Sequence, residues 1–551
     1  METETIQTDI LIAGGGIAGL LAAIRASELG AKVIVAEKGN VKYSGSGRAG
    51  NDHFWCYIPE VHGPDMDNFI RECMLKQQGP MLRIMGPKAV RAWVERTFDM
   101  VKLWDSWGIP MKRNGKYDFS GHAYPGRMRQ HLKYNGRNQK IVLTEKALEK
   151  GATIMNRIMI IDLLGDERGV VGALGIDTRR DRLVVFRANR VILGTGFMIR
   201  MYPNVTPALL ANNTRPFTLT GDGRAMAYRI GAGLVNMEML ARQPGMKNFC
   251  RSGQGSWIGV CRDASGRPIG KYMSEPDVHY SDMIMEVDSQ IFEKYQQAGT
   301  GPVYMDCTGV SRDDCEYMVN GLKDEGNHAS LEHLKEEGVD LRENLIEFDT
   351  YELRSTGSIA TDEHAETSVP GLYAVGDESG LSISGASIFG WIAAEHAVKH
   401  LNDAVSSPEH EVYENRINEI ETYIASMHAR TDGPDWYEAN LALNHTMADY
   451  AGLVRSETML QAGLSHLQRL KNKLDNTLIA RNRWELTRCL EVINLFDLGE
   501  LVFFAALART ESRGLHRRID YPYTDPLYNG KILAIKRTAD RPHTEWYDLP
   551  D

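Results

Sequence analysis

With 551 residues the chain is long enough for two to four domains, because domains commonly have about 100–200 residues. Hydrophobic residues make up 43% of the chain and charged residues 25%, a composition that excludes disordered, collagen-like and coiled-coil proteins. The 63 basic and 73 acidic residues give a net charge of −10, which argues against general nucleic-acid binding but allows a local anion-binding pocket.

The amino terminus and the cysteines bear on location and metal content. Met1-Glu2-Thr3-Glu4 is acidic where a secretory signal is basic, so we expect a cytoplasmic protein. The longest weakly polar run, residues 10–24, has 15 residues and contains four glycines, so we expect no transmembrane segment. The seven cysteines are scattered, which disfavours a disulfide scaffold, a zinc finger or an in-chain iron–sulfur cluster, and we expect no metal.

The first predicted unit is a strand, a turn, a helix and a second strand. Residues 9–13 form an apolar strand that enters a glycine turn, helix-forming residues follow, and residues 32–36 form the next strand. Gly14, Gly16 and Gly19 fit the Gly-x-Gly-x-x-Gly pattern of a pyrophosphate turn, and Glu37 stands where a carboxylate would hold ribose hydroxyls. The unit predicts adenine dinucleotide binding; the alternative is a doubly wound sheet whose glycines only pack.

Two later segments repeat the theme of a strand that ends in glycine. Residues 190–196 and 371–377 are short apolar strands followed by glycine-rich turns, as suits loops beside a cofactor. If both strands join the sheet begun at residue 9, the chain between them must hold an inserted domain. After about residue 403, amphipathic stretches such as 414–427 and 458–495 predict a helical domain.

Four features of the sequence carry a family resemblance. They are the first glycine turn with Glu37, the segment from Thr220-Gly221-Asp222-Gly223 to Asn236-Met237-Glu238, the segment 371–377, and Arg509-x-Glu511-Ser512-Arg513-Gly514-x-His516. With these features the chain resembles, over nearly its whole length, the flavoprotein subunits of the succinate dehydrogenase, fumarate reductase, L-aspartate oxidase and adenylylsulfate reductase superfamily. The resemblance implies FAD as the cofactor.

The resemblance also implies the fold class. We expect an α/β protein with a Rossmann-type FAD-binding domain, an inserted α+β capping domain and a carboxy-terminal helical domain. The expected boundaries are 1–240 and 353–402 for the FAD-binding domain, 241–352 for the capping domain, and 403–551 for the helical domain and tail.

The cofactor residues follow from the glycine turns and from the resemblance. Succinate dehydrogenases bond FAD to a histidine in the region that resembles residues 43–51, but no histidine stands there, so we expect non-covalent FAD. The residues expected to contact FAD are Gly14, Gly16, Ile17, Ala18, Gly19, Glu37, Lys38, Ser46, Gly47, Arg48, Gly50, Asn51, Gly194, Thr195, Gly196, Asp222, Gly376, Asp377, Ser387 and Ile388.

The chain departs from the dicarboxylate-binding pattern of fumarate reductases. Gln243 stands in place of one family histidine, Arg354 lies near the place of a second, and residues 383–388 lack the family arginine. We therefore do not expect efficient turnover of succinate or fumarate. Three other segments, residues 134–142, 234–238 and 301–306, most resemble the catalytic flavoprotein subunit of adenylylsulfate reductase.

Four residues are candidates for catalysis: Arg251, Arg354, Arg242 and His53. Arg251 lies near the place of the family's catalytic arginine, and an arginine can meet an oxyanion through two donors. His53 can supply or remove a proton near neutral pH. Each of these side chains has an alternative interpretation as a surface charge or a structural contact, and the same holds for His122 and His516.

The leading hypothesis is an FAD-dependent oxidoreductase that moves two electrons between the flavin and a small anionic substrate. Because the chain offers no cluster ligands, electron transfer would use a separate iron–sulfur, ferredoxin-like subunit. Two alternatives stay open: a self-sufficient oxidase of the L-aspartate oxidase type, and a catalytically inert flavin-binding protein. The substrate and the direction of electron flow are left open by the sequence.

Overall fold

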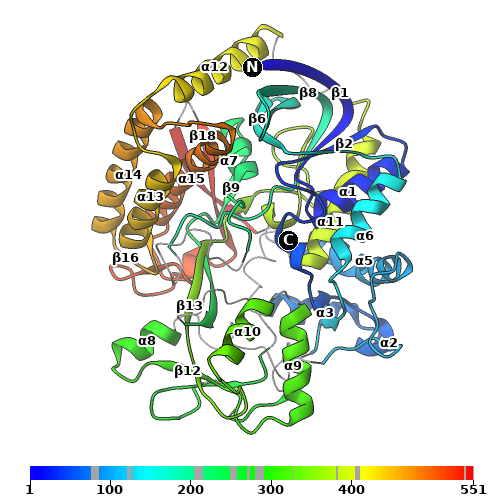
Figure 1. Ribbon diagram of the computed structural model, residues 1–551, viewed down its shortest axis with the longest axis vertical. Coiled ribbons are helices and arrows are strands. Elements are labelled where there is room, and N and C mark those ends of the chain that lie inside the picture. The colour runs from blue at the N-terminus through cyan, green and yellow to red at the C-terminus, as the bar shows by residue number, and fades with distance from the viewer. Residues whose placement is uncertain are drawn as a thin grey trace.

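A computed structural model describes residues 1–75, 86–120, 126, 128–203, 215–247, 257–269, 274–278, 291–324, 327–379, 382–403, 410–538 and 541–549. Figure 1 shows three parts, with a sheet flanked by helices at the upper right, a helical part on the left, and a part containing α8, α9 and α10 at the bottom. The predicted α/β fold class is confirmed. The domain boundaries given above stay a prediction.

The first part is built on a seven-stranded sheet with the order β5-β2-β1-β8-β7-β6, in which β15 also pairs with β8. β1, β2, β5, β8 and β15 run parallel to their neighbours in this group, whereas β6, β7 and β8 form an antiparallel meander. The strands are β1 (Glu2–Ala13), β2 (Val33–Glu37), β5 (Thr153–Asn156), β6 (Ile158–Asp166), β7 (Gly169–Asp177), β8 (Arg182–Leu193) and β15 (Leu372–Ala374).

The two late strands predicted from glycine-ended runs lie side by side in this sheet. β15 pairs with the end of β8 in parallel register, Leu372 opposite Val191 and Ala374 opposite Leu193. The chain between the two strands is therefore an insertion into the topology of the sheet. One face of the sheet packs against α1 and α11, and the core on the other face continues into the helical part.

Several elements near the sheet shape the site described below. β3 and β4 pair antiparallel with His53 opposite Lys133. The elements are α1 (Ile17–Glu28), η1 (Ser46–Ala49), β3 (His53–Trp55), α2 (Pro59–His62), α3 (Met66–Leu75), α5 (Gly86–Ser106), β4 (His131–Lys133), α6 (Gln139–Glu149), α7 (Asp222–Arg229), η4 (Gly376–Glu378) and α11 (Ile383–Lys399).

The inserted part has its own sheet and its own hydrophobic core. The sheet order is β10-β13-β12-β11, and Met246, Trp257 and Phe348 are among the buried side chains of that core. Its elements are β10 (Leu240–Met246), β11 (Val260–Arg262), α8 (Ile291–Gln297), β12 (Val303–Asp306), α9 (Arg312–Asp324), α10 (His328–Glu336) and β13 (Ile346–Ser355).

The carboxy-terminal part contains four long helices. The predicted amphipathic stretch 458–495 is two helices, because the chain turns after Leu478 and the Asn482 side chain accepts a hydrogen bond from Glu485 N to cap the second helix. The elements are α12 (His410–Ala429), α13 (Trp436–Ala451), β16 (Val454–Arg455), α14 (Glu457–Thr477), α15 (Arg483–Ala508) and β17 (Arg517–Arg518).

The segment after these helices is not a plain tail. It contains η5 (Pro526–Tyr528) and then forms the hairpin of β18 (Lys531–Thr538) and β19 (Arg541–Asp548). β18 pairs with β9 (Leu234–Val235), which in turn pairs with β14 (Ser358–Ile359). The end of the chain is thus tied to residues that precede and follow the insertion. Within the described ranges, no helix is both long and apolar enough to cross a bilayer.

Candidate functional site

The site begins at the glycine turn that joins β1 to α1. Gly14 N donates to Ala36 O at 2.8 Å, and Gly194 N donates to Ala13 O at 2.8 Å, so the turns after β1 and β8 lie together. Gly14 has φ +98°, and a Cβ there would stand 2.4 Å from Gly194 O, so only glycine fits this turn. No side chain caps the amino terminus of α1. Its first N–H groups and the positive end of its dipole are therefore available to an anion.

A cavity of about 310 Å³ opens at this turn, where the carboxyl ends of the parallel strands meet. It brings together most of the residues predicted to contact the cofactor, and it includes the catalytic candidates His53 and Arg354. The predicted cofactor residues in its wall are Gly14, Gly16, Ile17, Ala18, Glu37, Lys38, Ser46, Gly47, Arg48, Gly50, Asn51, Gly194, Thr195, Gly196, Asp222, Gly376 and Asp377.

Four predicted residues lie away from the wall of this cavity. Gly19 packs the helix on the turn, since a Cβ there would stand 2.1 Å from Gly14 O. Ser387 donates to Ile383 O at 2.8 Å within α11, and Ile388 is fully buried in the core. Arg242 is ion-paired with Glu293 at 2.5 Å inside the inserted part. Arg251 and His122 lie outside the described residues.

Glu37 and Lys38 end β2 but face different partners. The Glu37 carboxylate accepts hydrogen bonds from Gly15 N at 2.9 Å and Gly39 N at 2.7 Å, and its remaining lone pairs suit ribose hydroxyls. The Lys38 ammonium lies 2.7 Å from Asp222 and 2.9 Å from Glu491. Burial lowers the pKa of Lys38, but these two carboxylates outweigh burial and hold it above its ordinary value. Lys38 thus joins β2 to α7 and α15.

Three arginines line the cavity, and two of them contact Phe197, the residue that follows the glycine turn at 194–196. The Cζ atoms of Arg215 and Arg354 lie 4.6 Å and 4.9 Å from the centre of the Phe197 ring, and all three residues line the cavity. Burial raises the pKa of Asp377, while Arg215, a hydrogen bond from Ser46 and Arg354 favour its ionised form. With Arg48 also in the wall, cationic side chains outnumber anionic ones here, which favours an anion as ligand.

His53 belongs to a polar cluster at the edge of the cavity. Its Nδ1 lies 2.5 Å from Asp52 Oδ1, and Lys133 Nζ lies 2.6 Å from Asp52 Oδ2. The His53 ring also meets His131 edge to face, with ring centres 5.3 Å apart. Of this cluster, the sequence predicts only His53 as a site residue.

Several residues of the cavity wall are not predicted by the sequence. Arg215, Phe197 and Asn327 line it, and none of them lies in a recognisable pattern. Asn327 comes from the inserted part and Arg215 from the chain before α7. Only the fold brings such single residues together, so a single sequence carries no local signal for them.

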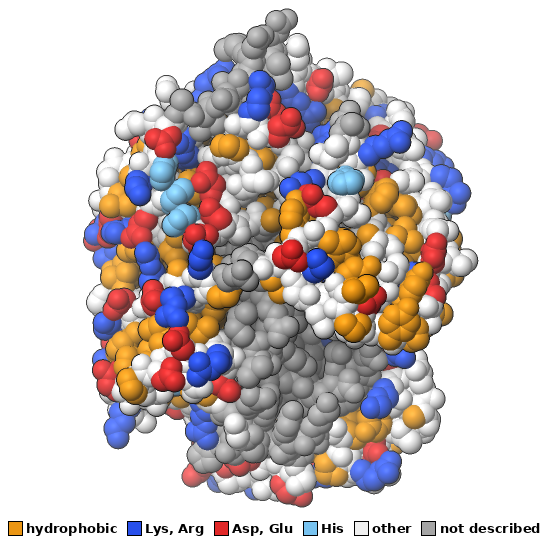
Figure 2. Space-filling view, turned by 180° about the vertical axis from the view of Figure 1, so that it is seen from behind, with side chains coloured by type: hydrophobic (Ala, Val, Ile, Leu, Met, Phe, Trp, Pro, Cys, Tyr) orange, Lys and Arg blue, Asp and Glu red, His pale blue; other side chains and the backbone are white. Residues whose placement is uncertain are grey.

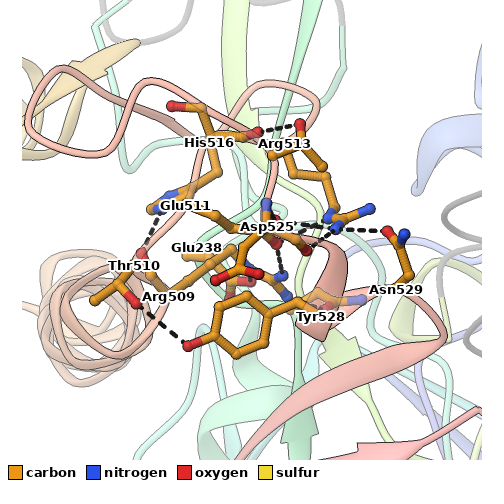
Figure 3. Close-up of polar contacts among 12 residues, drawn as sticks. Glu238, Arg509, Thr510, Glu511, Arg513, His516, Asp525, Tyr528 and Asn529 are labelled. Carbon is orange, nitrogen blue, oxygen red and sulfur yellow. Dashed lines mark hydrogen bonds and ion pairs between the residues drawn. The ribbon is translucent and has the colours of Figure 1, made fainter.

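The segment 509–516, the most specific carrier of the resemblance, lies in a buried polar network and not in the cavity wall (Figure 3). Arg509 bonds to Glu238 at 2.6 Å and to Glu511 at 2.7 Å, and Arg513 bonds to Glu511 at 2.8 Å. His516 Nε2 lies 3.1 Å from Arg509 O. Burial, followed by the charge of Arg455, lowers the pKa of His516 well below its ordinary value, so the ring is neutral. The segment therefore ties the carboxy-terminal part to residue 238.

A second group of histidines lies at the far end of α11. His364 stacks on His396 with ring centres 4.4 Å apart, and His396 lies 4.3 Å from His400. Histidine side chains gather beside acidic ones on the face that Figure 2 shows. α11 begins at the cavity with Ile383, and these rings lie more than three turns further along the helix. They are therefore separate from the cavity.

Comparisons with known proteins agree with this geometry. The family described as FAD binding domain matches residues 9–389, and the family described as fumarate reductase flavoprotein C-term matches residues 440–548. One subunit of the fumarate reductase (CoM/CoB) of Methanothermobacter marburgensis is 28% identical over 569 residues, 98% of each chain. L-aspartate oxidase of Yersinia pestis is 26% identical over 392 residues, 66% of each chain. The structure of adenylylsulfate reductase from Archaeoglobus fulgidus has a TM-score of 0.84 at 20% identity, over 100% of this chain and 96% of that chain, so the two share a fold.

Proposed function

The chain belongs to the flavoproteins that combine the FAD binding domain with the fumarate reductase flavoprotein carboxy-terminal domain, and we propose that it moves two electrons between FAD and a small anionic substrate held at Arg215 and Arg354. The observation that carries the proposal is the pair of guanidinium groups beside Phe197, in the same cavity as the glycine turns.

The residues at the glycine turns fit FAD. A Cβ at Gly16 would meet only Gly194 O, at 3.7 Å, so the backbone of the turn is open on the cavity side and can approach a pyrophosphate closely. Glu37 would hold ribose hydroxyls, and the amino terminus of α1 would face the pyrophosphate. FAD supplies the two-electron chemistry when it is bound. Because residues 43–51 contain no histidine, we propose that the cofactor is held without a covalent bond.

The arginines would bind and orient the substrate. A guanidinium presents several N–H donors in a plane, and in a cavity partly screened from water its attraction for an anion is much stronger than at the surface. Arg354 comes from β13 of the inserted part, so the insertion would supply part of the substrate site. Phe197 and Leu219, both buried, would exclude water from the reacting atoms.

We further propose a separate iron–sulfur protein as the electron partner. The relative from Methanothermobacter marburgensis is named as one subunit of its enzyme, which supports a role within an assembly. The seven cysteines of this chain are spread from Cys56 to Cys489 without the spacing of cluster ligands, so an outside carrier would be needed.

The test is anaerobic reoxidation of the photoreduced protein. We expect a flavin spectrum, reoxidation by one member of a panel of small anions that includes adenylyl sulfate, and slow reoxidation by fumarate. Arg354→Ala should slow the productive reaction by about 100-fold or more at unchanged FAD content, because it removes an electrostatic donor. Arg267→Ala, on an exposed side chain of the inserted part, is the matched control.

The same experiment separates the proposal from its rivals. Protein without flavin contradicts the cofactor site. If molecular oxygen reoxidises the reduced flavin and an amino acid is turned over, the protein is an oxidase instead. The similarity to L-aspartate oxidase supports that alternative. Protein that binds FAD but is reoxidised by none of the anions contradicts the substrate proposal.

A further inference from the structure

Two short strands place a charged pair beside the cavity. β3 and β4 pair antiparallel, and His53 lies directly opposite Lys133 in their register. Residues directly opposite each other in such a pair have side chains on the same face of the sheet. Asp52 precedes β3, and Tyr134 N donates to Asp52 O at 2.9 Å, so the backbone of Asp52 is held beside the residue that follows Lys133.

The Asp52 carboxylate binds both neighbours at once. Its Oδ1 lies 2.5 Å from His53 Nδ1, and its Oδ2 lies 2.6 Å from Lys133 Nζ. The side chains of Asp52 and Lys133 are 6% and 4% exposed, while that of His53 is 23% exposed and lines the cavity. The carboxylate accepts from Nδ1–H, which fixes the tautomer, so proton exchange with a bound ligand would take place at Nε2.

We propose that His53 is the proton-transferring residue of this site, and that Asp52 and Lys133 are positioning residues that set the pH at which His53 titrates. This inference rests on the proposed function. When the substrate accepts an electron pair from the cofactor, the imidazolium gives its Nε2 proton to the substrate atom that becomes negative, and the ring is left neutral. In the oxidation direction the neutral ring removes that proton, and the electron pair goes to the cofactor.

The third member of the cluster explains why the ring can both gain and lose a proton. A buried carboxylate beside a histidine stabilises the imidazolium, so the pair alone would hold the proton too firmly for transfer near neutral pH. Lys133 adds a positive charge on the other oxygen of the same carboxylate, which weakens that stabilisation. Lys133 also provides a positive charge beside the buried carboxylate of Asp52.

Other charged groups near His53 act in opposite directions. His131 faces its ring from β4, Arg48 and Arg354 add positive charge from the cavity wall, and Asp377 adds negative charge. α11, which also packs against β3, has no titratable side chain between Ile383 and Ala394. Of these charged groups, the Asp52 carboxylate bonds to the ring, and Lys133 acts on the ring through that carboxylate.

The first test measures the titration of His53 in the FAD-bound protein. Histidine labelled with ¹³C at Cε1 gives an NMR signal for each ring, and His53→Gln identifies the one from His53. Relative to wild type, Asp52→Asn should move the titration midpoint down and Lys133→Met should move it up, each by about one pH unit, the size expected from one neighbouring charge. His364→Gln, an exposed histidine of the group at the end of α11, should leave it unchanged.

Opposite shifts are the decisive result, because residues with a purely structural role would not move the midpoint in opposite directions. If Lys133→Met does not hold FAD, the nearly isosteric Asp52→Asn carries the test by itself. A midpoint that stays in place or rises in Asp52→Asn overturns the inference.

The second test links the ring to the redox reaction without a substrate. The midpoint potential of the bound FAD is measured against pH, with dyes as reference. The slope of the midpoint potential against pH should change at the pH where His53 titrates, and this change should be absent in His53→Gln. If the protein binds no FAD, the proposed function fails. If FAD binds and is reduced but the slope of wild type and His53→Gln is the same, the inference alone fails.

Discussion

Gly16 and Gly19 belong to the same glycine pattern, but we expect their replacement by alanine to affect different properties of the protein, cofactor binding at Gly16 and stability at Gly19. Gly16 has φ −66° and ψ −175°, which alanine adopts without strain, and its added Cβ would meet only Gly194 O, at 3.7 Å. Loss of a glycine cap should cost about 1 kcal/mol of stability or less. At Gly19 the added Cβ would stand 2.1 Å from Gly14 O and 3.2 Å from Ile12 Cγ2, so α1 must move away from β1 by about 1 Å. Such overpacking costs about 1–3 kcal/mol or more.

Gly16→Ala should nevertheless weaken the binding of the cofactor. The Gly16→Ala methyl group would stand in the cavity, where the backbone should approach the pyrophosphate, so we expect FAD affinity to fall by about 10- to 100-fold, or about 1.4–2.8 kcal/mol. Thermal unfolding of the FAD-free proteins measures the first effect, and titration of FAD by its fluorescence measures the second. Gly16→Ala that binds FAD as tightly as wild type, or Gly19→Ala that is as stable as Gly16→Ala, would refute the reasoning.

Three further predictions concern stability and the cofactor bond. Glu491→Gln removes a buried carboxylate that bonds to Lys38 and Arg200, each at 2.9 Å, and should lower the free energy of unfolding in denaturant by about 3–5 kcal/mol. The control is Glu419→Gln, on a side chain 66% exposed, which should lower it by less than about 0.5 kcal/mol. The free energy of unfolding should decrease as the pH drops below 6.5, the ordinary histidine pKa, because the unfolded chain binds protons that folded rings with a lowered pKa do not bind. Each unit by which the pKa of a ring is lowered contributes about 1.4 kcal/mol. Equal stability at pH 5 and pH 7 would contradict this prediction. The rings with lowered pKa are His62 and His396, mainly through burial, and His516, through burial and Arg455. Acid precipitation should release the yellow cofactor into the supernatant, and colour that stays in the pellet would indicate a covalent bond.

The parts of the fold that the sequence predicts are those set by local pattern. The strand and glycine turn at residues 9–16 and the two late strands are short-range signals, and β1, β8 and β15 lie together in the sheet as these signals predicted. The β18–β19 hairpin was missed, because its alternation is weak and its pairing partner β9 is nearly 300 residues earlier in the chain.

The candidate site divides in the same way. Part of the cavity wall comes from glycine turns that a pattern can reveal, and 17 of the 20 residues expected to contact FAD lie in that wall, while their contact with FAD stays a prediction. Other residues of the wall, such as Arg215, Phe197 and Asn327, come singly from different segments and share no spacing. Ser387 was expected to contact FAD, but it is not among the residues that line the cavity, and its hydroxyl donates to Ile383 O within α11. Which side chains of a helix face a cavity depends on the residue at which the helix begins, and the sequence predicts that residue only to within a few positions.

The position of Lys38 connects the carboxy-terminal helices to the cofactor turn. Lys38 follows Glu37 at the end of β2, and its ammonium bonds to Glu491 on α15 as well as to Asp222 on α7. Arg200, fully buried, bonds to the other oxygen of Glu491. Arg488, one turn earlier on α15, also lies 2.9 Å from this carboxylate. A buried carboxylate shared by three cations has few alternative arrangements, since any movement of α15 would leave charges unpaired in the interior. The helical part therefore fixes the end of β2, where Glu37 would hold the ribose. A change that displaces α15 should weaken cofactor binding, although no residue of α15 lines the cavity.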